Sequence, residues 1–279
     1  MPAREAALFD KLRARTAEVD RGLDGLLGFS IKDLKTGLTL ELRAGETFPT
    51  ASSIKAAVLY ELYRQAEEGR LDLAEVTRPP GGRVAGGGAL ELLSDQVRLT
   101  WRDLAALMFA FSDNEATNVL TRRLGLDAIN RRLDALGLPK TRMRRLMMDL
   151  EAARRGNENV STPSELRRLL ETLHAGTGLS AERARDLLAV ARVAKSSPFR
   201  VPLPPGLKVA DKEGSLEGVR CVGAVVDLAG RPYSAAIMTS YLKTDTDGED
   251  AIRALSLALF ETFDRLARAS EYGRVISER

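Results

Sequence analysis

Cysteine and histidine are nearly absent from this sequence. Its 279 residues include one cysteine, Cys221, and one histidine, His174. A single cysteine excludes an internal disulfide, and the strand-like pattern around Cys221 favours a buried structural thiol. One histidine cannot supply the Cys/His cluster of a zinc site, and His174 stands where a helix is expected to end. We therefore expect neither a metal ion nor a cofactor.

Long hydrophobic runs and an excess of one charge are also missing. No apolar run reaches the length of a membrane-spanning helix, so we expect no membrane span. The 42 basic and 39 acidic side chains leave a net charge of +3. The arginines are scattered and are not interleaved with aromatic residues, which make up 5% of the chain. We therefore expect no nucleic-acid partner.

The N-terminal segment 1–19 has the pattern of an amphipathic helix. It lacks the continuous apolar stretch of a signal peptide. As written, the chain is expected to be cytoplasmic; it would be periplasmic or secreted if a signal peptide had been removed. We expect a monomer that binds a small molecule.

Strand patterns occur at both ends of the chain, and helical patterns fill the middle. The hydrophobic content of 44% suits a soluble globular protein with a substantial core. A hairpin is expected over 28–45, with its turn at Lys35-Thr36-Gly37, and a glycine-rich loop over 79–89. The remaining expected elements are helices at 3–20 and 248–269 and strands at 206–214, 219–228 and 232–241.

This order predicts a single α+β domain over residues 1–279. An antiparallel sheet would be built from both chain ends and flanked by the terminal helices, with an all-helical subdomain inserted between its strands. We assign 1–50 and 205–279 to the α/β subdomain and 51–204 to the helical subdomain. A cleft between the two is a common place for a site.

The stretch "TASSIK" at 50–55 places Ser52 three residues before Lys55 at the start of a helix. Side chains at this spacing share a helix face. A lysine whose pKa is lowered by burial can take the proton of a serine nucleophile. Ser53 is two residues from the lysine, on another face, so Ser52 is the candidate nucleophile. The alternative is a capping serine beside a lysine that reaches solvent.

Two further triplets gain meaning beside this pair. Ser112-Asp113-Asn114 interrupts an apolar helical pattern, which by itself indicates a helix break. Lys212-Glu213-Gly214 follows a strand pattern and by itself indicates a strand that enters a turn. The order S-x-x-K, S-D-N, K-x-G is that of class A β-lactamases and penicillin-binding proteins.

The chain resembles the serine β-lactamase-like family over most of residues 26–270. Besides the three motifs, the resemblance is carried by "FPTASSIK", "LTWRDLAALMFAFSDNEATNVL", "NVSTPSEL" and "DKEGSLEGVRCVGAVVDLAGRPYSAAIMTS". It implies the β-lactamase/transpeptidase-like fold and a serine hydrolase that acts on cyclic amides through an acyl-enzyme.

The resemblance also implies a role for each motif residue. Ser52 would be acylated, and Lys55 would transfer its proton. Ser112 would protonate the leaving nitrogen. Asn114 would bind the substrate side-chain amide, and Lys212 the substrate carboxylate. Gly214 and Ser215 would face the acyl group, with the backbone N–H groups of Ser52 and Ser215 forming the oxyanion hole.

Two departures from the family pattern bear on activity. Glu213 occupies the middle of the K-[TS]-G motif, where the family has a hydroxyl. The loop that carries the deacylating glutamate in class A enzymes has no E-x-x-x-N, and counting back from Pro163 without gaps puts Leu146 at that position. Asp149, Glu151 and Glu158 are the carboxylates nearby, none in clear register.

Three functions therefore remain open. The first is β-lactam hydrolysis through Ser52, with slow deacylation. The second is a D-alanyl peptidase, amidase or esterase with the same nucleophile. The third is a non-catalytic binding protein on the same scaffold.

Overall fold

A five-stranded antiparallel sheet joins the two ends of the chain. The structure, a computed structural model, describes residues 3–79, 84, 88–270 and 272–275. The strand order is β2-β1-β9-β8-β7, so β7 is an edge strand. The strands are β1 (Leu26–Asp33), β2 (Thr39–Leu42), β7 (Val209–Leu216), β8 (Val219–Val226) and β9 (Tyr233–Ser240). The predicted α+β class and the sheet built from both termini are confirmed.

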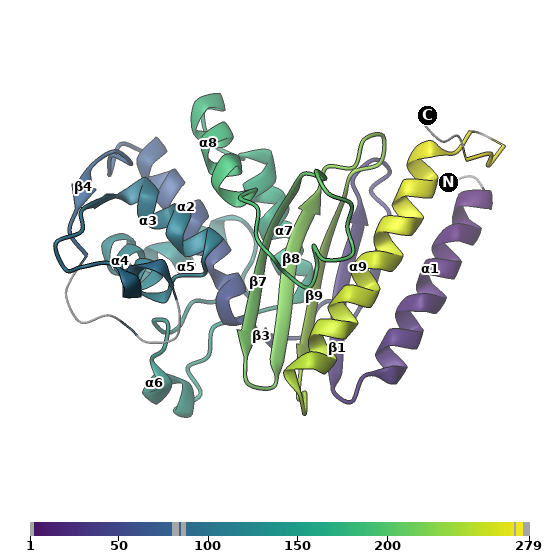
Figure 1. Cartoon of the computed structure of the whole chain (residues 1–279), viewed down its shortest axis with the longest axis horizontal. Helices are drawn as coiled ribbons and strands as arrows, with labels where there is room; N and C mark the ends of the chain where they lie inside the picture. Colours follow the sequence, from purple (N-terminus) through teal and green to yellow (C-terminus); the bar gives the residue numbers. More distant parts are fainter. Residues whose placement is uncertain (1–2, 80–83, 85–87, 271, 276–279) are drawn as a thin grey trace.

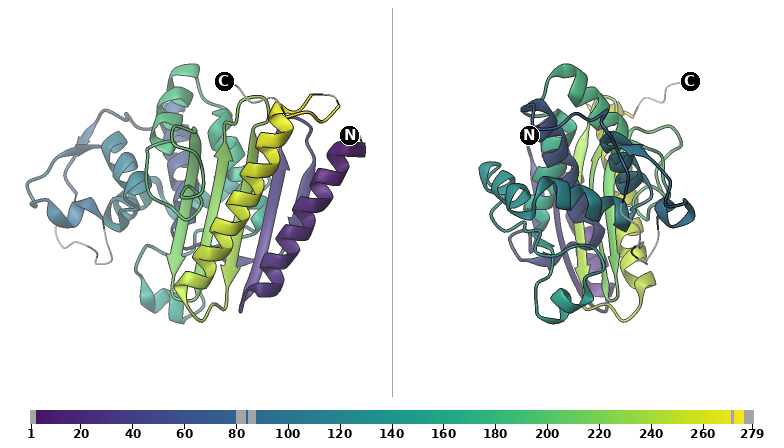
Figure 2. Two further views of the ribbon diagram at one scale, coloured as in Figure 1. Left: turned by 45° about the vertical axis from the view of Figure 1, so that its right-hand side comes forward. Right: turned by 90° about the vertical axis from the view of Figure 1, so that its left-hand side faces the viewer.

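Helices cover both faces of this sheet (Figures 1 and 2). Helices α1 (Ala3–Gly22) and α9 (Asp245–Arg268) pack side by side on one face, and α7 (Pro163–Ala175) packs on the other. Between α9 and the sheet, the rings of Tyr233 and Phe263 stack with centroids 4.5 Å apart. Strands β8 and β9 are buried along their whole length, which explains their nearly unbroken apolar sequence.

The remaining helices lie beside the β7 edge of the sheet (Figure 1). They are α2 (Lys55–Glu67), α3 (Trp101–Ala110), α4 (Asn114–Leu124), α5 (Leu126–Ala135), α6 (Leu150–Arg154) and α8 (Ala181–Ala191). Short elements connect them: the 3-10 turns η1 (Ala51–Ile54) and η2 (Ala89–Leu92), and the strands β3 (Phe48–Pro49), β4 (Val76–Thr77), β5 (Leu99–Thr100) and β6 (Val160–Ser161). Most of the glycine-rich loop expected over 79–89 lies outside the described residues. None of the helices in the described segments is long and apolar enough to cross a bilayer.

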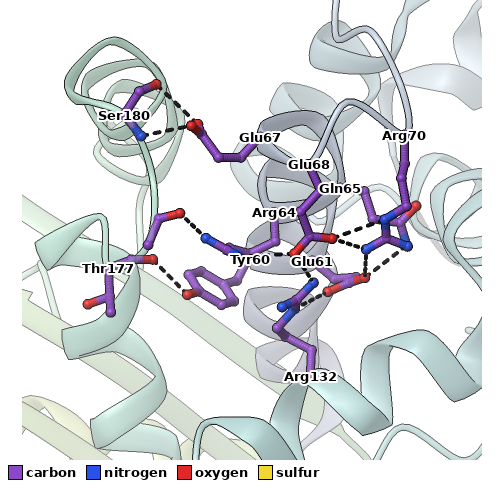
Figure 3. Close-up of polar contacts among 11 residues, drawn as sticks. Tyr60, Glu61, Arg64, Gln65, Glu67, Glu68, Arg70, Arg132, Thr177 and Ser180 are labelled. Atoms are coloured by element: carbon purple, nitrogen blue, oxygen red, sulfur yellow. Dashed lines mark hydrogen bonds and ion pairs between the residues drawn. The ribbon is translucent and has the colours of Figure 1, made fainter.

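Helix α2 is the central element of the helical region, and polar contacts fix it on two sides (Figure 3). On one side, Tyr60 Oη donates a 2.7 Å hydrogen bond to the carbonyl oxygen of Thr177, in the turn before α8. On the other side, the buried carboxylate of Glu61 accepts a 2.7 Å hydrogen bond from Arg132 Nε of α5. These contacts hold the helix whose first residue is Lys55.

Candidate active site

A cavity of about 310 Å³ opens where the helical region meets β7. Four segments contribute to its walls: the η1 turn, the α3–α4 turn, the β7 edge and the loop that leads into and out of α6. Its lining residues are Ala51, Ser52, Phe111, Ser112, Asn114, Arg145, Met147, Met148, Leu150, Asn159, Glu213, Gly214, Ser215 and Leu216. The three predicted motifs therefore meet at one cavity.

The η1 turn directs Ser52 into this cavity and buries Ser53. The carbonyl oxygen of Thr50 accepts hydrogen bonds from Ser53 N at 3.0 Å, Ser53 Oγ at 2.8 Å and Cys221 Sγ at 2.8 Å. Ala51 has a left-handed backbone with φ of 46°, a conformation that costs a non-glycine residue about 1–3 kcal/mol and is concentrated at functional sites. Neither η1 nor α2 has a side-chain cap, so the capping-serine alternative does not hold.

Lys55 is fully buried behind Ser52, and its ammonium is aimed at the S-D-N turn. Nζ donates to the carbonyl oxygen of Ser112 at 2.5 Å, to Ser112 Oγ at 3.1 Å and to Asn114 Oδ1 at 2.9 Å. These three hydrogen bonds use the three protons of an ammonium group, so Lys55 can act as a base only after it has released one of them. Lys55 therefore couples the nucleophile turn to the second motif.

The S-D-N turn is shaped by Asp113. Its Oδ1 accepts a 2.8 Å hydrogen bond from Ala116 N and so caps α4, while Oδ2 accepts one of 2.8 Å from Leu90 N. Ser112 adopts a left-handed backbone with φ of 54°. The turn thus has the helix break that its composition predicts, and the break places Ser112 Oγ in the cavity.

Ser112 Oγ lies between two buried lysines. Lys212 Nζ donates to it at 3.1 Å, the same distance as from Lys55 Nζ. Lys212 also donates to the carbonyl oxygen of Glu213 at 3.0 Å. A hydroxyl can accept from one lysine and donate to the other when the second is neutral, so this arrangement is suited to moving a proton.

Burial favours the neutral form of both lysines. It lowers the pKa of Lys55 well below its ordinary value, and the charge of Lys212 lowers it further, against an opposing effect of Asp113. Burial and the charge of Lys195 lower the pKa of Lys212 to about 8. Burial therefore makes both lysines more ready to give up a proton than an exposed lysine is.

The edge of β7 closes the cavity opposite the S-D-N turn. Gly214 lies directly against the nucleophile turn, because a Cβ added there would collide with the carbonyl oxygen of Thr50 and with Cys221 Sγ. Ser215, the next residue, is exposed and lines the cavity. The K-x-G strand therefore needs its glycine for close approach to Ser52.

The loop between α5 and α7 presents Met147 to the cavity. Asn118 of α4 holds the backbone of Met147, since Met147 N donates to Asn118 Oδ1 at 2.8 Å and Asn118 Nδ2 donates to Met147 O at 3.1 Å. Met147 lines the cavity, whereas Leu146 is not among its lining residues. Leu146, which the count without gaps puts at the glutamate position, therefore does not line this cavity, whereas the neighbouring Met147 does.

The carboxylates of this loop are engaged elsewhere. Asp149 caps α6 by accepting a 2.9 Å hydrogen bond from Ala152 N. Glu151 is exposed and pairs with Arg154 at 2.8 Å, and Glu158 pairs with Arg145 at 2.6 Å. Among the described residues that line the cavity, Glu213 is the one carboxylate.

Several residues at the site carried no signal in the sequence. Lys195 lies in the segment after α8, where its Nζ donates to the carbonyl oxygen of Asp211 at 2.6 Å and stands 4.6 Å from the ring centroid of Phe109. Asn118 is a further example, since its role depends on a loop 29 residues away.

His174 is not part of the site: its Nε2 lies 2.7 Å from Asp227 Oδ1, and neither residue lines the cavity. Within the described ranges, no group of three or more metal-ligating side chains is found.

Comparisons with known proteins point to one family. Residues 11–263 match the model of the β-lactamase enzyme family. A β-lactamase of Streptomyces cellulosae is 30% identical over 220 residues, which cover 76% of this chain and 69% of the relative. β-Lactamase ROB-1 of Haemophilus influenzae is 30% identical over 254 residues, with coverages of 86% and 80%.

Solved structures agree with these sequence matches. A β-lactamase from Sphaerobacter thermophilus superimposes with a TM-score of 0.81 at 27% identity, covering 90% of this chain and 96% of the other. A leucine-to-glutamate variant of PBP-A, in an acyl-enzyme complex with penicillin G, superimposes with a TM-score of 0.82 at 26% identity and coverages of 91% and 96%. The chain therefore belongs to the β-lactamase enzyme family and is a serine hydrolase of the β-lactamase type.

Proposed function

We propose that this hydrolase opens β-lactams by forming an acyl-enzyme on Ser52 and that it releases the acyl group slowly. The observation that carries the proposal is the position of Ser112 Oγ, 3.1 Å from both Lys55 Nζ and Lys212 Nζ in the cavity that Ser52 lines. This network supplies a base and a proton donor, and Ser52, the nucleophile, lines the same cavity.

Acylation begins with attack of Ser52 Oγ on the carbonyl carbon of the lactam. The new O–C bond forms as the proton of Ser52 passes to neutral Lys55, and negative charge collects on the carbonyl oxygen. The backbone N–H groups of Ser52 and Ser215 would stabilise that charge, and the loss of one such donor costs about 10²–10³ in rate.

Collapse of this intermediate breaks the C–N bond. Ser112 gives its proton to the leaving nitrogen and regains one from Lys55, so the proton of Ser52 ends on the opened amide nitrogen. Lys212 remains charged and supports the Ser112 hydroxyl. Asn114 would hold the side-chain amide of the substrate.

Deacylation needs a base that activates water on the ester carbonyl, and a positioned base contributes about 10²–10⁴ in rate. The loop offers Met147 to the cavity, and its carboxylates are capped, exposed or paired. We therefore propose that the acyl-enzyme is long-lived.

The same observation favours a second candidate, a D-alanyl peptidase, amidase or esterase that uses Ser52. Such an enzyme would transfer the acyl group of its natural substrate. β-Lactams would act on it only as slow acylating agents. PBP-A, whose leucine-to-glutamate variant forms an acyl-enzyme with penicillin G, shares the fold of this chain. The match to an enzyme family argues against the third function, a binding protein without catalysis in which Ser52 reacts with no electrophile.

Intact-protein mass spectrometry tests the proposal. The protein is mixed with a fluorescent penicillin, and adduct mass and β-lactam turnover are followed together. We expect one persistent adduct on the wild type, none on Ser52→Ala, and a retained adduct on Ser53→Ala, the matched control. Fast turnover without adduct would contradict slow release, and the absence of both adduct and turnover would refute β-lactam acylation.

A further inference from the structure

Within the described part of the chain, the carboxylate of Glu213 has neither a hydrogen-bond nor an ion-pair partner. Its side chain is partly buried and lines the cavity beside Ser52. Among the described residues, the side-chain hydrogen bond that Glu213 receives goes to its backbone carbonyl oxygen and not to its carboxylate.

The cations around this carboxylate are already neutralised. Lys195 Nζ lies 3.6 Å from Asp211 Oδ1, and Arg145 pairs with Glu158. Arg220, behind β7, pairs with Asp245 and lies 3.7 Å from Glu249. Lys55 and Lys212 are the buried lysines beside the cavity; burial favours the neutral form of both, and Glu213 offsets the charge of Lys212. The described cavity therefore offers a substrate carboxylate no net positive charge.

A second cavity reaches Glu213 from the side of α9. It has a volume of about 130 Å³ and shares Glu213, Gly214 and Ser215 with the acyl cavity. Glu249 also lines it. Burial raises the pKa of Glu213; Lys212 and Lys195 oppose this change, while Asp211 and Glu249 add to it. The surroundings of Glu213 thus already disfavour the negative charge of its own carboxylate. A substrate carboxylate would bring a second negative charge to the same place and would be repelled.

We propose that Glu213 sets the specificity of the acyl cavity, which selects acyl donors with a neutral or cationic group beside the reacting amide in place of a carboxylate. This inference rests on the proposed acylation of Ser52 and names the substrate class of that reaction. The donor is a small amide or ester whose group next to β7 is an ester, an amide or an ammonium.

Three matched β-lactams test the inference: penicillin G as the free acid, as its methyl ester and as its 2-aminoethyl amide. All three present the same lactam ring, and the comparison of each rate between the wild type and Glu213→Gln separates the effect of Glu213 from the intrinsic reactivity of each compound. Rates are measured by intact-protein mass spectrometry on the wild type, Glu213→Gln and Glu213→Thr. Glu213→Gln keeps the size of the side chain and removes its charge.

In the wild type we expect the ester and the aminoethyl amide to acylate Ser52 about tenfold faster than the free acid, or more, because like charges a few ångströms apart repel strongly at a partly buried site. Glu213→Gln should reduce this ratio, and Glu213→Thr should make the free acid the fastest of the three.

Acylation of the wild type with a preference for the free acid that Glu213→Gln leaves unchanged would overturn the inference and leave the proposed function intact. Failure of all three compounds to label the wild type and both variants would refute the proposed function, and the inference with it. Thermal unfolding of each variant shows whether the fold is retained.

Discussion

Replacing Met147 with glutamate should convert slow release into turnover. Met147 is 7% exposed and lines the acyl cavity, and its backbone is held by Asn118 through hydrogen bonds of 2.8 and 3.1 Å. A glutamate here would start from a fixed backbone and extend a carboxylate into the space beside Ser52. The variant supplies the one group that deacylation lacks.

The expected gain follows from general-base catalysis, which is worth about 10²–10⁴ when the base is well placed. We expect the lower end, about 10², because the new carboxylate has no surrounding groups arranged for it. The substitution also removes buried apolar surface and buries a charge, so the free energy of unfolding should fall by about 1–3 kcal/mol.

The assay is a pulse-chase experiment. The protein is acylated with a fluorescent penicillin, excess unlabelled penicillin is added, and the lifetime of the adduct is followed by mass. Met147→Gln is the matched control, since its amide has nearly the same shape but cannot accept a proton from water. Leu146→Glu tests the neighbouring position. Equal adduct lifetimes in Met147→Glu and Met147→Gln, or faster release in Leu146→Glu, would refute this reasoning.

Three further predictions concern stability and the nucleophile turn. Burial and the charge of Lys195 lower the pKa of Lys212 from 10.5 to about 8, so between these values the unfolded chain binds a proton that the folded protein has released. The free energy of unfolding should therefore rise with pH across this window, and urea titrations should find a smaller rise in Lys212→Met; an equal rise would contradict the assignment. Arg132→Met removes the 2.7 Å partner of the buried Glu61, which keeps Gln65 at 2.8 Å and Arg70 at 3.5 Å. It should lower the free energy of unfolding by about 1–3 kcal/mol, whereas the exposed Arg131→Met should change it by less than about 0.5 kcal/mol. Gly214→Ala should slow acylation by about tenfold or more, because its Cβ would displace the turn that carries the nucleophile; an unchanged acylation rate would show that this approach is not required.

The sequence by itself determined the class of the protein and the identity of its motifs. Period-two segments at the two ends and helical periods between them predict the sheet and its covering helices, because local patterns record which faces are buried. The spacing of Ser52 and Lys55 predicts a shared face, and Ser112-Asp113-Asn114 predicts a break between helices. Each of these features depends on neighbours within a few residues.

Only the tertiary structure decided how these pieces meet. Ser112 Oγ is 3.1 Å from two lysines that lie 57 and 100 residues away in the chain. Met147 lines the cavity and Leu146 does not. This placement depends on Asn118, 29 residues away, which holds the backbone of Met147. In the described cavity Glu213 stays unpaired, while the carboxylates around it are paired or capped. This difference depends on loop paths and rotamers. These are set by long-range packing, which leaves no periodic trace in the sequence.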